Sequence, residues 1–139
     1  MNKEKPVVFE GPIDVLEKVP GLLGFTPKNS LVLLSVSEDD VLVDVRCITL
    51  GKKQTEKAEN YVPILRSMCG DTCAVIAVFF VDYKTTWAKF GQDFMDLDNF
   101  WFKDVIYLNK ENRWGSYICK DELCCPNKGK LLEKVLVDA

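Results

Sequence analysis

The sequence predicts an α/β or α+β fold, with a single mixed β-sheet of five or six strands and helices packed on it. First, residues 30–37 and 41–50 are rich in leucine and β-branched residues and flank a short acidic turn, a pattern typical of an antiparallel hairpin. Second, residues 73–82 are almost continuously apolar, which indicates a central strand covered on both faces. Third, apolar residues recur at helical spacing elsewhere. A chain of 139 residues fits one domain, residues 1–139.

The N-terminal segment predicts one helix. We expect residues 1–6 to be a flexible terminus and residues 7–9 to form a short edge strand. Apolar residues spaced three apart then predict a short amphipathic helix, with Pro12 near its first turn and Pro20 after its end. These apolar residues are Ile13, Leu16 and Val19. Residues 21–30 follow as a turn-rich connector whose apolar side chains we expect to pack down.

A second helical pattern covers residues 53–68, between the hairpin and the apolar strand. Pro63 lies inside it and predicts a kink or a break into two short helices. Gly70 is a plausible C-terminal cap. The residues predicted to share one buried side are Ala58, Tyr61, Leu65 and Met68. The order of strand, helix and strand favours a crossover connection.

Residues 83–102 are rich in aromatic side chains. Helical spacing relates Trp87, Phe90, Phe94 and Leu97, and the same span carries Asp93, Asp96 and Asp98. These acids lack the pattern of a calcium-binding loop, and we expect a solvated face. A strand over residues 103–108, a turn over 109–112 and a returning strand over 113–118 follow. Residues 131–137 are predicted to form a short helix or strand.

Composition excludes several classes of function. The chain has no histidine, so Ser-His and Cys-His catalysis and histidine metal ligands are excluded, and a non-enzymatic role is favoured. The net charge of -3 argues against a nucleic-acid partner. No apolar run is long enough for a membrane-spanning helix, and residues 1–6 have no secretory pattern, so we expect a cytoplasmic protein. The sequence predicts no particular oligomeric state.

Three of the six cysteines gather in one turn, at Cys119, Cys124 and Cys125, and Cys69 and Cys73 form a second pair. Three interpretations stay open: reduced thiols packed in the fold, a disulfide or redox turn, or a zinc site. Zinc needs four ligands, and neither pair has the common two-residue spacing. We expect no cofactor, with zinc as the one alternative. Separately, the aromatic cluster around Trp101 and Phe102 is a candidate surface for a protein partner.

Two motifs resemble a known family. Residues 22–32, LLGFTPKNSLV, resemble the signature LLGFxPxxSLV. Residues 113–119, RWGSYIC, followed by CCPNKG at 124–129, resemble the signature RWWSYxC…CCPxxG. Both signatures belong to an uncharacterised family common in actinobacteria, domain-of-unknown-function family 4192. The resemblance covers roughly residues 13–131.

The resemblance implies no activity, because none is established for the family. It does single out Arg113, Trp114 and Tyr117, together with the cysteine turn, as a structural or binding unit. The chain departs from the family in two ways. Gly115 stands where the family commonly has a second tryptophan, and the resemblance implies a helical C-terminal part that we expect this short version to lack. We expect a non-enzymatic binding or regulatory module for a protein partner, of phage or mobile-element origin. The alternative is a cysteine-based redox or structural-metal protein.

Overall fold

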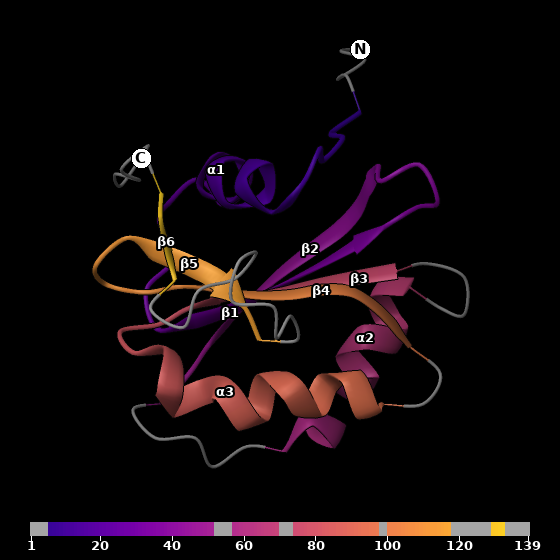
Figure 1. Ribbon diagram of the computed structural model, residues 1–139. Helices are drawn as coiled ribbons and strands as arrows, with labels where there is room; N and C mark the ends of the chain where they lie inside the picture. The colour runs from indigo at the N-terminus through magenta and orange to yellow at the C-terminus, as the bar shows by residue number, and fades with distance from the viewer. Residues whose placement is uncertain (1–5, 52–56, 70–73, 98–99, 118–128, 133–139) are drawn as a thin grey trace.

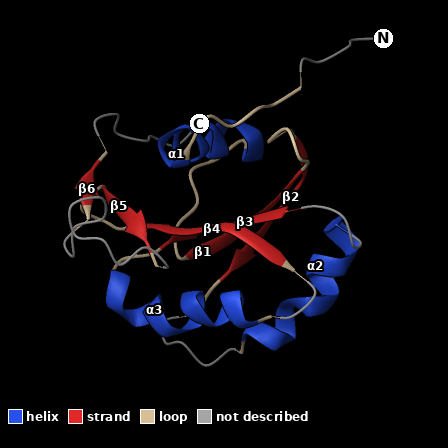
Figure 2. Ribbon diagram, turned by 45° about the vertical axis from the view of Figure 1, so that its right-hand side comes forward, coloured by secondary structure: helices blue, strands red, loops and turns tan. Residues whose placement is uncertain are grey.

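The computed structural model describes residues 6–51, 57–69, 74–97, 100–117 and 129–132. They form an α+β fold with a single six-stranded mixed sheet, as predicted, and the strand order is β2-β1-β3-β4-β5-β6. Helix α1 covers one face of the sheet, and α2 and α3 cover the other (Figures 1 and 2). The elements are α1 (Pro12–Leu23), β1 (Ser30–Val36), β2 (Leu42–Thr49), η1 (Ala58–Tyr61), α2 (Val62–Cys69), β3 (Ala74–Phe80), α3 (Lys84–Asp93), η2 (Phe94–Asp96), β4 (Trp101–Leu108), β5 (Arg113–Ser116) and β6 (Lys130–Leu131).

Helix α1 is longer than predicted, because Pro20 lies inside it and not after its end. The helix stops at Gly24, whose left-handed φ of 82° lets its amide donate to the Pro20 carbonyl at 2.8 Å. A proline removes one helical hydrogen bond. The Pro20 ring is buried at this position. The buried side also differs from the prediction, because Val15, Leu16 and Val19 are buried whereas Ile13 is exposed.

The predicted hairpin is confirmed as β1 and β2, which pair in antiparallel register from Ser30↔Thr49. Strand β2 is an edge of the sheet. Its Val45 amide donates to the Asp44 carboxylate at 2.8 Å, and the Arg46 guanidinium binds the same carboxylate at 3.1 Å. The predicted edge strand over residues 7–9 is reduced to one isolated bridge, between Val8 and Val41. Residues 1–5 lie outside the described residues.

Pro63 breaks the second helical pattern as predicted, since η1 ends at Tyr61 and α2 begins at Val62. All four residues predicted to share its buried side are buried: Ala58, Tyr61, Leu65 and Met68. Gly70 lies outside the described residues. Strands β2 and β3 are both antiparallel to β1 and are therefore parallel to each other, so the connection through α2 is a crossover.

Strand β3 is the predicted central strand, and all seven of its residues are buried. It pairs antiparallel with β1 and parallel with β4, which it reaches through α3 and η2. The helical pattern in this span is confirmed, because its four apolar residues are buried: Trp87, Phe90, Phe94 and Leu97. Asp93 forms an ion pair with Lys89, Asp96 is exposed, and Asp98 lies outside the described residues.

Strand β4 begins at Trp101, two residues earlier than predicted, because Trp101 and Phe102 pair with the start of β3. The register then slips. Phe102 faces Val75 and Asp104 faces Ile76, so the residue between them, Lys103, has no partner on β3 and forms a bulge. Alternation along a strand would otherwise place Phe102 and Asp104 on the same face. The bulge instead turns Asp104 toward the α1 side.

Strands β4 and β5 form the predicted hairpin. The Asn109 side chain accepts hydrogen bonds from the Glu111 and Arg113 amides, at 2.9 and 3.1 Å, and fixes the turn. Strand β6 follows as a two-residue strand on β5. Residues 118 and 133–137, which were predicted to continue these elements, lie outside the described residues. Among the described residues, no helix is both long and apolar enough to cross a membrane.

Candidate binding site

The cysteine prediction falls almost entirely outside the described residues. This holds for Cys73, Cys119, Cys124 and Cys125, and for the side chain of Cys69 at the end of α2. Cys47 on β2 is described, as a half-buried free thiol that packs against the α1-side core. The redox, zinc and packing interpretations of the cysteine turn therefore stay predictions.

Arg113 and Trp114 hold the last strand onto the sheet. The Arg113 guanidinium donates to the Gly129 carbonyl at 3.2 Å, and Arg113 pairs with Leu131 across β5 and β6. Trp114 is 7% exposed and packs in the core on the α1 side, with the Lys130 ammonium 5.7 Å from its ring centroid. The Arg113 guanidinium and the Trp114 ring therefore both have partners within the fold, and their contacts are structural.

Tyr117 lies on the opposite face of the sheet, in the core under α3. Its hydroxyl donates to the Lys84 carbonyl at 2.8 Å, and its own carbonyl accepts from the Gln92 amide side chain at 3.2 Å. The ring stacks on Tyr107 with a centroid distance of 5.1 Å. Burial raises the pKa of the Tyr117 phenol, and the neighbouring Tyr107 raises it further. Tyr117 therefore clamps β5 to α3.

Trp101 and Phe102 are neighbours with different environments. Phe102 is buried against Phe94, with ring centroids 5.3 Å apart. Trp101 is 67% exposed, at the start of β4. Trp114 pairs with Leu108 at the other end of the same strand. The structure therefore does not bring the five predicted binding residues together, and of these five only Trp101 presents a large exposed aromatic surface.

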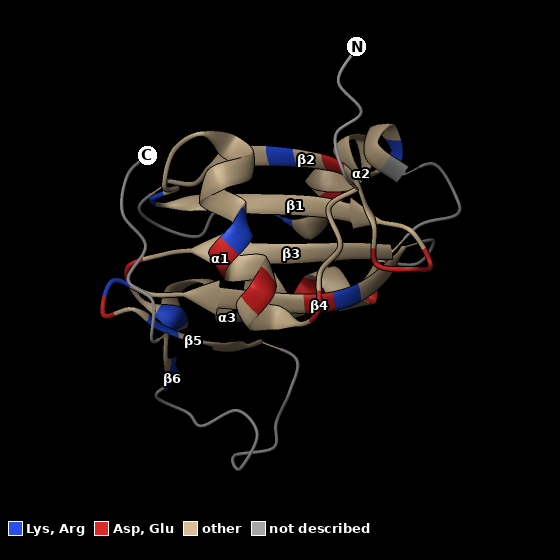
Figure 3. Cartoon of the chain, turned by 90° about the horizontal axis from the view of Figure 1, so that it is seen from above, with Lys and Arg blue, Asp and Glu red and all other residues tan. Residues whose placement is uncertain are grey.

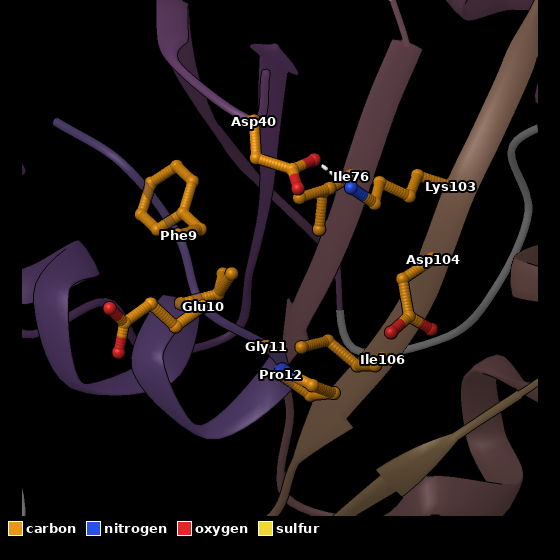
Figure 4. A pocket seen from close by; sticks show the side chains of 10 residues that line it. Phe9, Glu10, Gly11, Pro12, Asp40, Ile76, Lys103, Asp104 and Ile106 are labelled. Carbon is orange, nitrogen blue, oxygen red and sulfur yellow. Dashed lines mark ion pairs between the residues drawn. The ribbon is translucent and has the colours of Figure 1, made fainter. Parts of the chain in front are cut away.

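A cavity of about 280 Å³ lies between the start of α1 and the start of β4, on the α1 side of the sheet (Figure 4). Its apolar wall includes Val15 from α1 and Ile76 and Ile106 from the sheet. The remaining wall comes from the segment before α1, from the β1–β2 turn and from the bulge of β4. These residues are Phe9, Glu10, Gly11, Pro12, Asp40, Lys103 and Asp104.

The bulge separates two charged groups in this cavity. Lys103 forms an ion pair with Asp40, which lies on the turn between β1 and β2 (Figure 4). Asp104 instead accepts hydrogen bonds from the Val105 amide, at 3.0 Å, and from the Ser116 hydroxyl. Burial raises the pKa of the Asp104 carboxyl, while these two hydrogen bonds act in the opposite direction. Among the described residues, no lysine or arginine forms an ion pair with Asp104.

A second cavity of about 370 Å³ lies beyond the opposite ends of β3 and β4. It is lined by part of the first motif, Thr26 to Asn29, and by the turn before the second motif, including Asn112. The Lys110 ammonium on its rim donates to the Tyr83 hydroxyl at 2.6 Å, and this hydrogen bond raises the pKa of Lys110. The fold thus brings a segment of the first motif close to the turn that precedes the second motif, where the Lys110 ammonium already has a hydrogen-bond partner.

Comparison with known protein families assigns the chain. The family model described as Domain of unknown function (DUF4192) matches residues 12–135. The chain belongs to the DUF4192 family. The DUF4192 match begins at Pro12, the first residue of α1, and therefore excludes residues 9–11 of the cavity wall. Trp101 and Asp104 lie within the match. Neither a curated protein nor a solved structure matches the chain.

Gly115, where we expected a departure from the family signature, has a structural reason to be small. It pairs with Tyr107 across β4 and β5, and a Cβ at position 115 would lie 2.8 Å from the Tyr107 hydroxyl. A Cβ at Gly129 would lie 2.9 Å from the same oxygen. The two glycines therefore enclose the buried tyrosine, and a larger residue at either position requires Tyr107 to move.

Sequence reasoning missed the cavity residues Asp40, Lys103 and Asp104. Asp40 was assigned to a tight polar turn, which is correct, and the other two to a strand, which is also correct. A lysine and an aspartate side by side inside an otherwise apolar strand were the available signal. Their separation by a bulge depends on the pairing with β3, which local sequence does not encode.

Proposed function

We propose that this chain is a non-enzymatic binding module for a protein partner, and that Trp101 lies at the centre of the contact. The observation that carries the proposal is the 67% exposure of this indole at the start of β4. Tryptophan is enriched among residues that dominate the free energy of binding at protein interfaces. A side chain of this size on the surface has no part in the packing of either core.

The surroundings of Trp101 support a contact surface and not an isolated exposed residue. Val8 and Ile13, both exposed apolar residues, lie on segments that line the same cavity as Lys103, two residues after Trp101. Trp101 pairs with Ala74 of the α1-side core, which places its side chain on the α1 side of the sheet. Figure 3 shows this face, with α1 lying across the strands. Apolar residues with charged neighbours are typical of the core and rim of an interface.

Site-specific photo-crosslinking in the producing cell tests the proposal. A benzophenone amino acid replaces Trp101 in one strain and Tyr83 in another. Tyr83 is the matched control, because it is also an exposed aromatic residue but lies at the opposite end of β3. We expect one discrete crosslinked protein from position 101 and none from position 83. The Trp101→Ala substitution should then weaken binding to that purified protein by about 2 kcal/mol or more, as for a central interface residue.

Two results would contradict the proposal. One is the absence of any crosslink at position 101 while the protein sediments as a monomer at all concentrations. The other is equal crosslinking at positions 101 and 83, which would indicate non-specific contact. A cytoplasmic location and a phage or mobile-element origin stay parts of the proposal, and imaging of a fluorescent fusion tests the first.

The cysteine-based alternative needs its own test. Native mass spectrometry with and without alkylation distinguishes a zinc adduct, a loss of two hydrogens per disulfide, and six free thiols. A zinc adduct or a disulfide would favour the structural-metal or redox function. Six free thiols without metal would leave the binding module as the working proposal.

A further inference from the structure

Negatively charged side chains outnumber positively charged ones among the described residues that line the cavity between α1 and β4. Among the described residues that line it, three supply carboxylates, Glu10, Asp40 and Asp104, and one supplies an ammonium, Lys103. Lys103 is already paired with Asp40. The Asp104 carboxylate is half-buried and, among the described residues, forms no ion pair with a lysine or arginine. A carboxylate withdrawn from water without a cation is costly, and a bound cation would reduce that cost.

The start of α1 does not make this an anion site. The partial positive charge at a helix N-terminus arises from its free amides. Here the first helical residue is Pro12, which has no amide hydrogen, and Asp14 adds a carboxylate to the first turn. That carboxylate accepts the Glu10 amide and pairs with Lys18, both at 2.9 Å. The local field in the cavity therefore favours a cation.

The apolar wall favours an organic cation over a metal ion as the occupant of the cavity. Val15, Ile76 and Ile106 offer only hydrocarbon to an occupant, whereas hard metal ions require six or more oxygen ligands. A volume of about 280 Å³ lies just below the range of about 300–1,000 Å³ for drug-sized ligands. The occupant that fits both the charge and the wall is a short aliphatic chain that ends in a cationic group.

We propose that this cavity binds a primary amine, with the ammonium group on the Asp104 carboxylate and the alkyl chain against Val15, Ile76 and Ile106. The raised pKa of Asp104 agrees with a site that is completed by a positive charge. The amine is either a free small molecule or the lysine side chain of a peptide. The amine site uses Asp104, Val15, Ile76 and Ile106, whereas the proposed protein contact centres on Trp101, which does not line the cavity.

Titration of the isotopically labelled full chain with n-butylammonium chloride, followed by amide chemical shifts, tests the proposal. The isosteric neutral control is 1-butanol, and the anionic control is sodium butyrate, all at constant ionic strength. We expect saturable shifts at the amides of Gly11, Val15 and Ile106 with butylammonium, and none with butyrate. Parallel titration with Nα-acetyl-lysine amide separates the two sources: tighter binding than butylammonium indicates a peptide lysine, and weaker binding a free amine.

Two substitutions probe the carboxylate. Asp104→Asn should weaken butylammonium binding by about tenfold or more, since a charge-assisted hydrogen bond is lost. Asp44→Asn is the matched control, because Asp44 also accepts the amide of the following residue, at 2.8 Å, but lies on the far edge of the sheet. It should leave the affinity unchanged. Equal binding of butanol and butylammonium, or an unchanged affinity in Asp104→Asn, would overturn the proposal.

A second variant keeps the test informative if Asp104→Asn does not fold. Lys103 is exposed, so Lys103→Met should be tolerated. It removes the ammonium that the described residues of the wall supply, and it releases Asp40 from its ion pair. We expect butylammonium to bind up to about fivefold more tightly, in line with the strength of partly exposed charge pairs. An unchanged or weaker affinity would count against a cation site.

Discussion

The ring of Tyr117 lies directly against Gly91 of helix α3, so closely that a Cβ on Gly91 would lie 2.6 Å from Tyr117 Cδ2. The same tyrosine bonds to the Lys84 carbonyl near the start of α3 and to the Gln92 side chain near its end. Tyr117, the residue that follows strand β5, therefore contacts helix α3 along the length of its side chain. The contact depends on the absence of a side chain at position 91.

This contact predicts opposite effects for the same substitution in two helices. Gly91→Ala should destabilise the fold by about 1–3 kcal/mol, because the methyl group overpacks against a buried ring. Gly21→Ala in α1, where nothing lies within 4 Å of the added Cβ, should stabilise it by about 0.5–1 kcal/mol through helix propensity. Urea unfolding of both variants measures the difference. A stabilising Gly91→Ala would show that β5 does not pack on α3 in this way.

Tyr117→Phe should cost about 0.5–1.5 kcal/mol at pH 7, because it removes the hydrogen bond to Lys84 and leaves the ring in place. The pKa of this phenol is raised in the folded state above its ordinary value of 10.0. The unfolded chain therefore releases the proton first, and the stability from Tyr117 is present below pH 10 and falls above it. Urea unfolding from pH 8 to 11 should show the wild type losing its advantage over Tyr117→Phe, at up to about 1.4 kcal/mol per pH unit. A constant difference across this range would contradict a buried neutral phenol.

Asp104→Asn should be neutral to stabilising at pH 7, although it replaces a hydrogen-bonded residue. The amide oxygen can still accept from Val105 and Ser116, while the half-buried charge is removed. The pKa of Asp104 is raised by burial above its ordinary value of 3.8, so its ionisation works against folding as the pH rises through that range. The gain from Asp104→Asn should therefore be present at pH 7 and absent at pH 3. Thermal unfolding at both pH values checks this, and marked destabilisation at pH 7 would show that the charge is compensated.

The three tryptophans should respond differently to a soluble quencher. Trp101 is 67% exposed, whereas Trp87 and Trp114 are 4% and 7% exposed. Acrylamide quenching of the wild type should show one accessible fraction, and Trp101→Phe should remove it with a stability change within about 0.5 kcal/mol. In contrast, Trp114→Ala should cost about 3–5 kcal/mol, as for a large buried aromatic residue. An accessible fraction that survives in Trp101→Phe would mean that another indole is open to solvent.

Much of the fold follows from local pattern, because each strand and helix has a periodicity that its own residues carry. The apolar run of β3, the hairpin of β1 and β2, and the break at Pro63 are examples. Pro20 was wrongly placed outside α1, because its burial within the helix depends on tertiary packing that local sequence does not encode. The spacing of Trp114 and Tyr117, three apart in a strand, already implies opposite faces. Sequence reasoning grouped them by motif and did not use that period.

The cavity could not be predicted in the same way, because it depends on contacts between distant segments. Asp104 lines it only because Lys103 forms a bulge, and the bulge exists only through pairing with β3. Its other walls come from the segment before α1 and from Asp40. The exposure of Trp101, by comparison, depends on where β4 begins, and that boundary was set by two pairs with Ala74 and Val75.

The free edge of the sheet bears on solubility. The Leu50 amide points toward β1, since it donates to Asn29, and alternation along the strand then turns the Val45 amide away from β1, toward solvent. Edge amides of this kind are templates for intermolecular strand addition and aggregation. Here the Asp44 carboxylate already occupies the Val45 amide, and Arg46 holds that carboxylate in place. A strand from another molecule would have to break this charge-assisted hydrogen bond before it could bond to the Val45 amide. The Asp44 carboxylate therefore opposes strand addition at the middle of β2.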